Sequence, residues 1–244
     1  NRDLFCENQF FSSGRIANHR SAMPSSEKIG LENFHTIFLD DDAELKSYKR
    51  PGLVHRLDLD TSGVLVIAKT KRAHRKLSLQ FQQRKVIKKY LAVVDGTIEA
   101  EEGEFRFPII RDAAKKMWIV SENGKPSLTR FKVLERSPAL SLLLLECVTG
   151  RTNQLRIHCA AAGCPILGDT ERGGKKASRL FLHAWSLTLR HPASGQMMEF
   201  VSEPDGDFKD LIVSRLPGAV ERLPWHLSGH LDSVKNNDSV YNHG

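Results

Sequence analysis

Short apolar runs, each bounded by turn residues, constrain the fold of this chain more than any other feature. Clear examples are VLVIA at 64–68, KKYLAVVDG at 88–96, ALSLLLLECV at 139–148 and RLFLHAWSLTLRHP at 179–192. Short apolar runs that end at Gly or Pro are typical of strands rather than helices. Most connections between the runs have hairpin length, so neighbouring strands should pair antiparallel. We therefore expect an α+β fold with a largely antiparallel mixed sheet and flanking helices.

Three stretches have the pattern of helices. KRAHRKLSLQFQQR at 71–84 carries apolar residues at every fourth position, and Thr70 precedes it as a candidate N-cap. TNQLRIHCAAAG at 152–163 is predicted to form a second helix that ends at Gly163. Residues 206–216 are predicted to form a closing helix. The chain contains no Gly-rich phosphate loop, which argues against a nucleotide-binding βαβ fold and a nucleotide cofactor.

Basic charge is concentrated in one segment. The whole chain has a net charge of +7, whereas residues 50–90 carry 11 Lys or Arg against 2 Asp, a net charge of +9. Such clustering favours a polyanionic partner, above all a nucleic acid, although a solvated basic face is equally compatible with it.

Cysteine usage and hydropathy bear on compartment and metal content. The four cysteines form no CxxC pair, so we expect no zinc site. No apolar run is long enough to span a bilayer, and no secretory signal is visible. We expect a cytoplasmic protein without a membrane partner, and we expect Cys147 and Cys159 to be small buried residues in a reducing compartment.

The stretch VHRLDLDTSG at 54–63 is unusual because charged residues interrupt an otherwise strand-like sequence. If it is extended, Arg56 and Asp58 lie on one side of the backbone. The break that follows at 60–63 places Asp58 close to a loop, where catalytic groups are often found. The alternative is a surface ion pair, which contributes little to stability.

A second cluster lies in GRTNQLRIH at 150–158, where Arg151 and Arg156 crowd the start of a predicted helix. A helix N-terminus favours anions, and the planar guanidinium group matches phosphate or carboxylate in two-point contact. The alternative is a pair of solvated helix residues. An Arg from this cluster beside Asp58 would keep that carboxylate ionised, as a nucleophile or general base requires.

These motifs together resemble a known family. HRLDLDTSG resembles the signature H-R-L-D-x-x-T-S-G of the RluA-like pseudouridine synthases, and GRTNQLRIH and KKYLAVVDG are similar to the family's two further signatures. CPILGD at 164–169 and LFLHAWSLTLRHP also match, so the resemblance covers about residues 50–203. It implies the catalytic-domain fold of that family.

The resemblance implies an isomerase that converts uridine in RNA into pseudouridine without cofactor or metal. By match to the motifs, Asp58 would be the catalytic carboxylate, and Tyr90 would stack on the target base. Asp58 would either attack C1′ of the ribose or remove the 2′ proton. Arg156 would pair with Asp58, and Leu155 would line the pocket. Arg56 would hold the target nucleotide out of the RNA stem, a step that costs a few kcal/mol.

Charge alone, rather than any motif, adds four candidate phosphate contacts to this set. They are Arg72, Lys88, Lys89 and Arg151.

The chain also departs from the family pattern. Residues 1–50 contain no N-K-P element, and Cys164 stands where the family usually has His. We therefore expect an atypical, loop-rich N-terminal segment at 1–50, a pseudouridine synthase catalytic domain at 51–216 and a polar tail at 217–244.

Two other readings of the motifs remain open. A metal-dependent nuclease would use Asp58 and Asp60, because hard cations bind paired carboxylates, but a chelator would then abolish its activity. A non-catalytic RNA-binding protein derived from a synthase would bind RNA without turnover, and the intact Asp58, Tyr90 and Arg156 argue against it. For the enzyme we expect a monomer acting on ribosomal RNA, transfer RNA or both.

Overall fold

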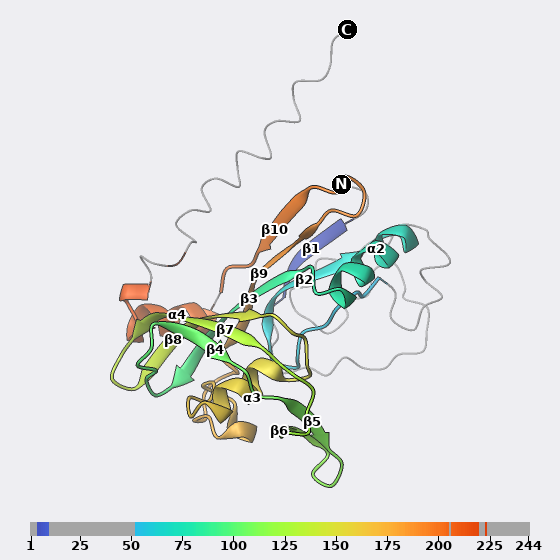
Figure 1. Cartoon of the computed structure of the whole chain (residues 1–244). Coiled ribbons are helices and arrows are strands. Elements are labelled where there is room, and N and C mark those ends of the chain that lie inside the picture. The colour runs from blue at the N-terminus through green and yellow to red at the C-terminus, as the bar shows by residue number, and fades with distance from the viewer. Residues whose placement is uncertain (1–3, 10–51, 205, 220–222, 224–244) are drawn as a thin grey trace, which may run out of the picture.

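A mixed sheet forms the centre of the molecule (Figure 1). The computed structural model describes residues 4–9, 52–204, 206–219 and 223. Across the sheet the strands lie in the order β1 (Leu4–Gln9), β2 (Ser62–Ala68), β9 (Leu182–Arg190), β3 (Ile87–Asp95), β8 (Leu140–Cys147), β7 (Thr129–Arg136) and β4 (Glu102–Phe105), and β10 (Met197–Val201) also pairs with β9. Only β2 and β9 pair in parallel among these strands; the other pairs are antiparallel, which confirms the expected fold class.

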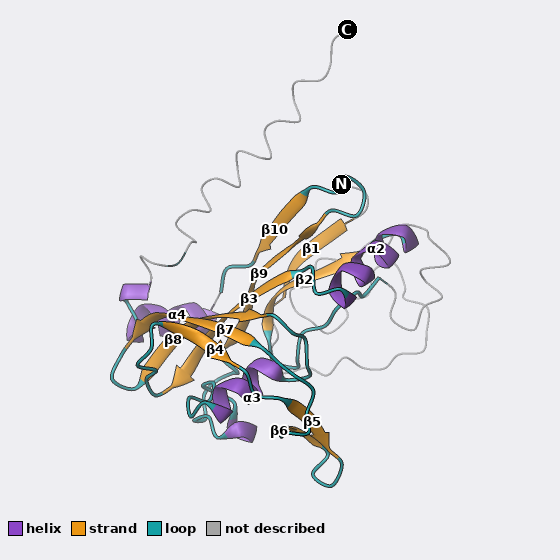
Figure 2. Cartoon of the chain, viewed as in Figure 1, coloured by secondary structure: helices purple, strands orange, loops and turns teal. Residues whose placement is uncertain are grey.

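Helices cover both faces of this sheet (Figure 2). They are α2 (Lys71–Gln82), α3 (Gln154–Ala161), the short 3-10 helix η1 (Thr170–Arg172) and α4 (Gly206–Arg215). A separate hairpin of β5 (Ile109–Asp112) and β6 (Met117–Val120) projects beside α3. No helix in the described part of the chain is long and apolar enough to cross a membrane.

The elements around β2 form as the sequence predicts. Every residue of β2 is buried, which explains its continuous apolar run. The side chain of Thr70 caps α2 by accepting a hydrogen bond from the backbone N–H of Ala73 at 3.1 Å. Ala73 and Leu77 are buried on the face of α2 that packs against Val64 and Val66 of β2.

The side-chain alternation of β3 separates the two faces of the sheet. Leu91 and Val93 pack in a cluster with residues of α4, whereas Ala92 and Val94 pack in a cluster with residues of α3. Tyr90 projects on the same side as Ala92 and contacts both the α3 cluster and the α2 cluster. Helices α2 and α3 therefore flank Tyr90 on one face, while α4 covers the other.

Residues 54–60, which the sequence analysis considered as a possible extended stretch, form no strand in the structure. They form an irregular segment with a turn at 59–60, in which Asp60 has a left-handed φ of 67°. The backbone N–H of Val66 in β2 donates to the ring Nε2 of His55 at 3.0 Å, so a side chain takes the place of a ladder partner. This side-chain contact ties the segment to β2 without strand pairing.

The sequence predicted the structure at the two ends of the chain less well than in the middle. β1 pairs antiparallel with β2, and no pattern in the first 50 residues predicted it. The rest of the expected N-terminal segment, and nearly all of the expected tail, lies outside the described residues. At the C-terminal side, Ala219 and Leu223 are buried in the same cluster as Phe208 of α4, so the packed core extends past residue 216.

Candidate active site

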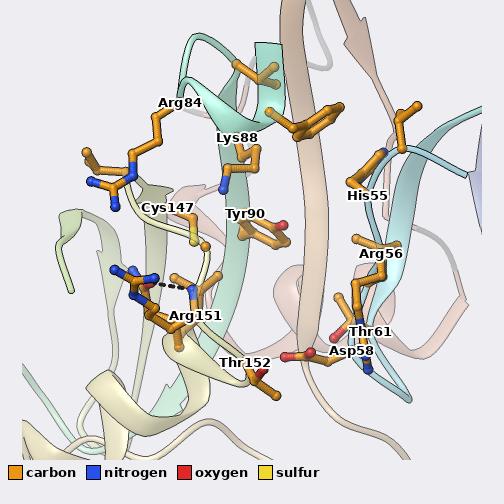
Figure 3. A pocket seen from close by; sticks show the side chains of 18 of the residues that line it. His55, Arg56, Asp58, Thr61, Arg84, Lys88, Tyr90, Cys147, Arg151 and Thr152 are labelled. Atoms are coloured by element: carbon orange, nitrogen blue, oxygen red, sulfur yellow. Dashed lines mark hydrogen bonds between the residues drawn. The ribbon is translucent and has the colours of Figure 1, made fainter. Parts of the chain in front are cut away.

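A cavity of about 410 Å³ lies on the face of the sheet that α2 and α3 flank. Its floor includes Tyr90, and the segment that carries Asp58 forms one side (Figure 3). Among the described residues, the charged side chains that line it are one carboxylate, Asp58, and four cations, Arg56, Arg84, Lys88 and Arg151. The structure thus brings the two charged motifs to one place, although they are far apart in the sequence.

His55 anchors the segment that carries Asp58. Besides accepting from Val66, its ring stacks on Phe81 of α2, with ring centroids 4.7 Å apart and an interplanar angle of 14°. Burial, helped by the nearby charge of Lys88, lowers the pKa of His55 to about 3. The ring is therefore neutral at physiological pH, as it must be to accept a hydrogen bond through Nε2.

The Thr-Ser-Gly part of the first motif fixes the other end of this segment. Ser62 is fully buried; its hydroxyl accepts a hydrogen bond from Arg179 at 2.6 Å and lies 2.8 Å from Nδ1 of His183. Because Nε2 of His183 is bound to the carbonyl of Ser202 at 2.8 Å, it is the donor, and Nδ1 accepts from Ser62. Burial lowers the pKa of His183 to about 4, which agrees with this neutral ring.

Gly63 is required because β2 approaches β9 very closely at this point. A Cβ atom there would lie 2.2 Å from the carbonyl oxygen of Ala184, and Gly63 has a φ of +110°. The backbone N–H of Thr61 also donates to the carbonyl of Asp58 at 3.1 Å, which closes the turn. The polar motif therefore builds a rigid turn that presents the Asp58 carboxylate to the cavity.

Asp58 has opposing influences on its ionisation. Burial is the largest and raises its pKa above the ordinary value. The charges of Arg156 and Arg56, a hydrogen bond from the backbone N–H of Asn153 and the charge of Arg172 all act to lower it, but burial prevails. Asn153 is the N-cap residue of α3, so the start of this helix points a backbone donor at Asp58.

Tyr90 projects from the central strand β3, between Leu145 of β8 and Ala184 of β9. The β3–β9 register shifts between Lys89 and Tyr90, and such bulges are common beside active sites because they re-aim a side chain. Burial raises the pKa of Tyr90 well above its ordinary value, so the phenol stays protonated. Its ring therefore offers a neutral aromatic surface within the cavity.

The second motif is held by Gln154, a residue that the sequence analysis did not single out. Its Oε1 accepts from the hydroxyl of Thr149 at 2.6 Å and from the backbone N–H of Arg151 at 3.0 Å. Its Nε2 donates to the carbonyl of Leu128 at 2.9 Å and to the hydroxyl of Thr129 at 3.0 Å. This buried, fully bonded amide fixes the loop that carries Arg151 along one side of the cavity.

Arg156 does not pair with Asp58, which corrects the interaction expected from the motif. Its Nε and Nη2 donate to the two carboxylate oxygens of Asp169 at 2.7 and 2.6 Å, and Nη2 also donates to Glu171 at 2.8 Å. The Asp169 side chain is 0% exposed, so this carboxylate needs a fixed counter-charge, and the guanidinium fork supplies it in two-point contact. Arg156 acts on Asp58 only through space.

The other candidate residues divide into two groups. Arg56, Leu155, Lys88 and Arg151 line the cavity together with Asp58 and Tyr90. Arg156, Lys89 and Arg72 do not line it.

The alternation of β3 explains one of these differences. Lys88 and Tyr90 share a side of the strand, whereas Lys89, between them, lies opposite Glu146 of β8. Arg72 is exposed in the first turn of α2. A contact of either residue with RNA stays a prediction.

Arg84 is a cavity residue that the sequence analysis missed. It follows the end of α2, and no motif marks it. Asp169 was missed as well, because only the folded chain shows that it faces Arg156.

No group of three or more His, Cys, Asp or Glu side chains within the described residues is arranged to hold a metal ion. Asp60, which a metal-dependent nuclease would use with Asp58, is exposed in the turn and does not line the cavity. The geometry therefore gives no support to the nuclease reading.

Comparison with known proteins identifies the family. A family model described as RNA pseudouridylate synthase matches residues 16–161. The chain belongs to this family. Its residues are 39% identical to ribosomal large subunit pseudouridine synthase D of Nitrosomonas europaea, over 80% of this chain and 60% of that protein. They are 38% identical to ribosomal large subunit pseudouridine synthase C of Vibrio vulnificus, over 67% of this chain and 55% of that protein.

A solved structure agrees with this family assignment. Human RNA pseudouridylate synthase domain containing 1 is 34% identical, with a TM-score of 0.57 over 62% of this chain and 68% of that chain. The resemblance of the motifs to the RluA-like pseudouridine synthases is thus confirmed, as is the fold. The chain spans a little over half the length of the two bacterial relatives.

Proposed function

We propose that this protein isomerises uridine to pseudouridine in RNA, with Asp58 as the catalytic carboxylate. The main support for the proposal is that Asp58 and Tyr90 line the same cavity, together with several cationic side chains. The chain is also a member of the RNA pseudouridylate synthase family. The family supports the reaction, and the cavity supports the choice of residues. The catalytic domain expected at 51–216 is part of the same proposal, and β1 and the buried residues Ala219 and Leu223 pack with it.

The reaction needs only a positioned carboxylate and a base-binding surface. The bond from ribose C1′ to N1 of uracil breaks, the base turns, and C1′ bonds to C5. The proton lost from C5 is balanced by the proton gained at N1, so no oxidant, reductant or energy source is consumed. Asp58 acts either on C1′ or on the 2′ proton, and the neutral ring of Tyr90 stacks on the detached uracil.

Substrate binding follows from the charges and from the position of the cavity. A base inside a stem must leave the stack to reach Asp58, and Arg56, exposed at the mouth, fits the role of filling the vacated place. Lys88 and Arg151 supply phosphate contacts, and Leu155 forms an apolar wall. The names of the bacterial relatives favour RNA of the large ribosomal subunit over transfer RNA as the first substrate to test.

The test is incubation of the purified protein with in-vitro-transcribed bacterial large-subunit ribosomal RNA, followed by carbodiimide mapping of pseudouridine. We expect modification at a defined uridine, with or without a chelator, and none with Asp58→Asn. Modification by Asp58→Asn at the rate of the parent would contradict the role of Asp58. Specific RNA binding by the parent without any pseudouridine, on ribosomal and transfer RNA alike, would favour the non-catalytic alternative.

A further inference from the structure

Arg84 combines an unfavourable backbone conformation with a position at the cavity. The end of α2 is a Schellman motif, in which the N–H of Arg84 bonds to the carbonyl of Phe81 at 3.1 Å and the N–H of Lys85 bonds to that of Gln80 at 2.9 Å. The residue in the Arg84 position of this motif is usually Gly, because it is left-handed. Arg84 nevertheless adopts a φ of 55°. A conformation that costs about 1 kcal/mol for a residue with a Cβ is retained at a functional cavity.

The side chain of Arg84 faces other cations rather than a carboxylate. Figure 3 shows Arg84, Lys88 and Arg151 together on the side of the cavity opposite Asp58. The described residues provide no hydrogen-bond or ion-pair partner for the Arg84 guanidinium group. The Arg151 guanidinium group donates through Nη2 to the carbonyl of Pro126 at 3.4 Å. Three positive charges that share one wall repel one another, so an anion placed between them lowers this repulsion.

The space beside Lys88 and an unused donor of Arg151 also favour an anion at this wall. The ammonium group of Lys88 donates to the carbonyl of Thr149 at 3.3 Å, which fixes it beside Gly150. A Cβ atom at Gly150 would lie 3.4 Å from that ammonium nitrogen, so a bare glycine leaves the space beside the charge open. The Nε of Arg151 is buried without a hydrogen-bond partner among the described residues, so a donor remains to be used.

We propose that Arg84, Lys88 and Arg151 form a binding site for one backbone phosphate of the RNA next to the target nucleotide. This inference rests on the proposed function, because the cavity must receive an RNA strand. The anchored phosphate lies on the wall opposite Asp58, so it holds the strand across the cavity while the uracil enters toward Tyr90. Arg84 supplies the guanidinium fork that suits a phosphate in two-point contact.

The decisive variant is Arg84→Gly, because it separates stability from binding. Gly relieves the left-handed conformation, so Tm should rise by about 2–4 °C. Loss of the phosphate contact should weaken RNA binding by about tenfold. It should also reduce the slope of log affinity against log salt by about 0.7. Binding is measured on the fragment of ribosomal RNA that carries the uridine modified by the parent.

Lys116→Gly is the matched control. Lys116 has a φ of 54° in the β5–β6 hairpin and does not line the cavity, so this change relieves the same conformation and removes the same charge. It should raise Tm similarly and leave RNA affinity within about twofold of the parent. Equal losses of affinity in both variants, or none in Arg84→Gly, would overturn the phosphate site.

A third variant guards against a folding defect. Arg84→Gln keeps a long side chain and removes only the charge, and it should show the same loss of affinity and salt slope as Arg84→Gly. Parental binding by Arg84→Gln would also count against the site. If the parent neither modifies nor binds RNA, the proposed function is wrong. If the parent modifies RNA and both Arg84 variants bind RNA as tightly as the parent, only the phosphate site is wrong.

Discussion

Asp58 stands in surroundings that favour its neutral form, although the proposed reaction needs the carboxylate. Burial raises its pKa, and the surrounding positive charges only partly compensate. A carboxyl whose pKa is raised in the folded state lowers the free energy of unfolding at any pH above its pKa in the unfolded state. The reason is that the unfolded chain then ionises more readily than the folded one. The site therefore maintains a destabilising charge, as functional sites often do.

Asp58→Asn should therefore raise stability while abolishing turnover. We expect a higher Tm at pH 7, since the amide keeps the shape and removes the buried charge. The gain should shrink as the pH falls through the raised pKa of the folded state and disappear below 3.8, the ordinary pKa of this carboxyl, because Asp58 is then protonated in both the folded and the unfolded parent. Turnover should fall by at least about 100-fold. Thermal unfolding at several pH values checks this, and a Tm lowered equally at every pH would contradict it.

Arg156 should be coupled in stability to Asp169 and not to Asp58. The Asp169 side chain is 0% exposed and that of Arg156 is 14% exposed, so removing Arg156 leaves a buried carboxylate unpaired. We expect Arg156→Ala to lower the free energy of unfolding by about 3–5 kcal/mol.

A double-mutant cycle distinguishes the two candidate partners of Arg156. Arg156→Ala combined with Asp169→Ala should lose less than the sum of the single changes, whereas its effect should add to that of Asp58→Asn. Urea unfolding of the single and double variants measures both couplings. A large coupling with Asp58 would restore the pair expected from the motif.

At the scale of elements, the parallel contact between β2 and β9 depends on Gly63. Gly63→Ala brings a Cβ atom within 2.2 Å of the Ala184 carbonyl, in addition to the strain of a positive φ. We expect a loss of more than about 3 kcal/mol. Gly195→Ala is the control, because Gly195 has a φ of +75° but no atom within 4 Å of its added Cβ. It should cost about 1 kcal/mol, and equal losses in urea unfolding would show that only the conformation matters.

The sequence predicted the elements well where local signals were strong. β2, β3 and β8 follow apolar runs bounded by turns, and α2 follows from its cap and its four-residue periodicity. β1 was missed because its pairing with β2 depends on a partner more than 50 residues away. The sequence did not show how the segment at 54–60 is anchored, because its bond to β2 runs from the backbone of Val66 to the side chain of His55.

The cavity brings together several of the expected residues, but not all of the contacts expected between them. Asp58, Tyr90 and Leu155 meet as the motifs imply, but the partner of Arg156 depends on how the loop after α3 folds back. The difference between Lys88 and Lys89 was readable in advance, because only Lys88 is two residues from Tyr90 in a strand. Arg84 had no such signal, since its position depends on the left-handed end of α2.

At the scale of the whole molecule, basic charge is placed where the cavity opens. The segment 50–90 contains the stretch that carries Asp58, helix α2 and the start of β3. Its net charge of +9 exceeds the +7 of the whole chain. Arg56, Arg84 and Lys88 from this segment line the cavity, and Arg151 joins them from the second motif. The proposed RNA substrate would meet a positive field on this face, which would accelerate its association and make that association sensitive to salt.

Lys88 and Lys89 provide a test of whether the cavity or the overall charge binds RNA. Both changes, Lys88→Ala and Lys89→Ala, remove one charge from the same strand, so a general field would respond equally. Lys88 lines the cavity, whereas Lys89 lies opposite Glu146 on the other side of β3. Lys88→Ala should weaken RNA binding by about tenfold and reduce the salt slope by about 0.7, because one phosphate contact is lost. Lys89→Ala should stay within about twofold of the parent. Titrations at several salt concentrations measure both quantities, and equal effects of the two variants would assign RNA binding to the general field rather than to the cavity.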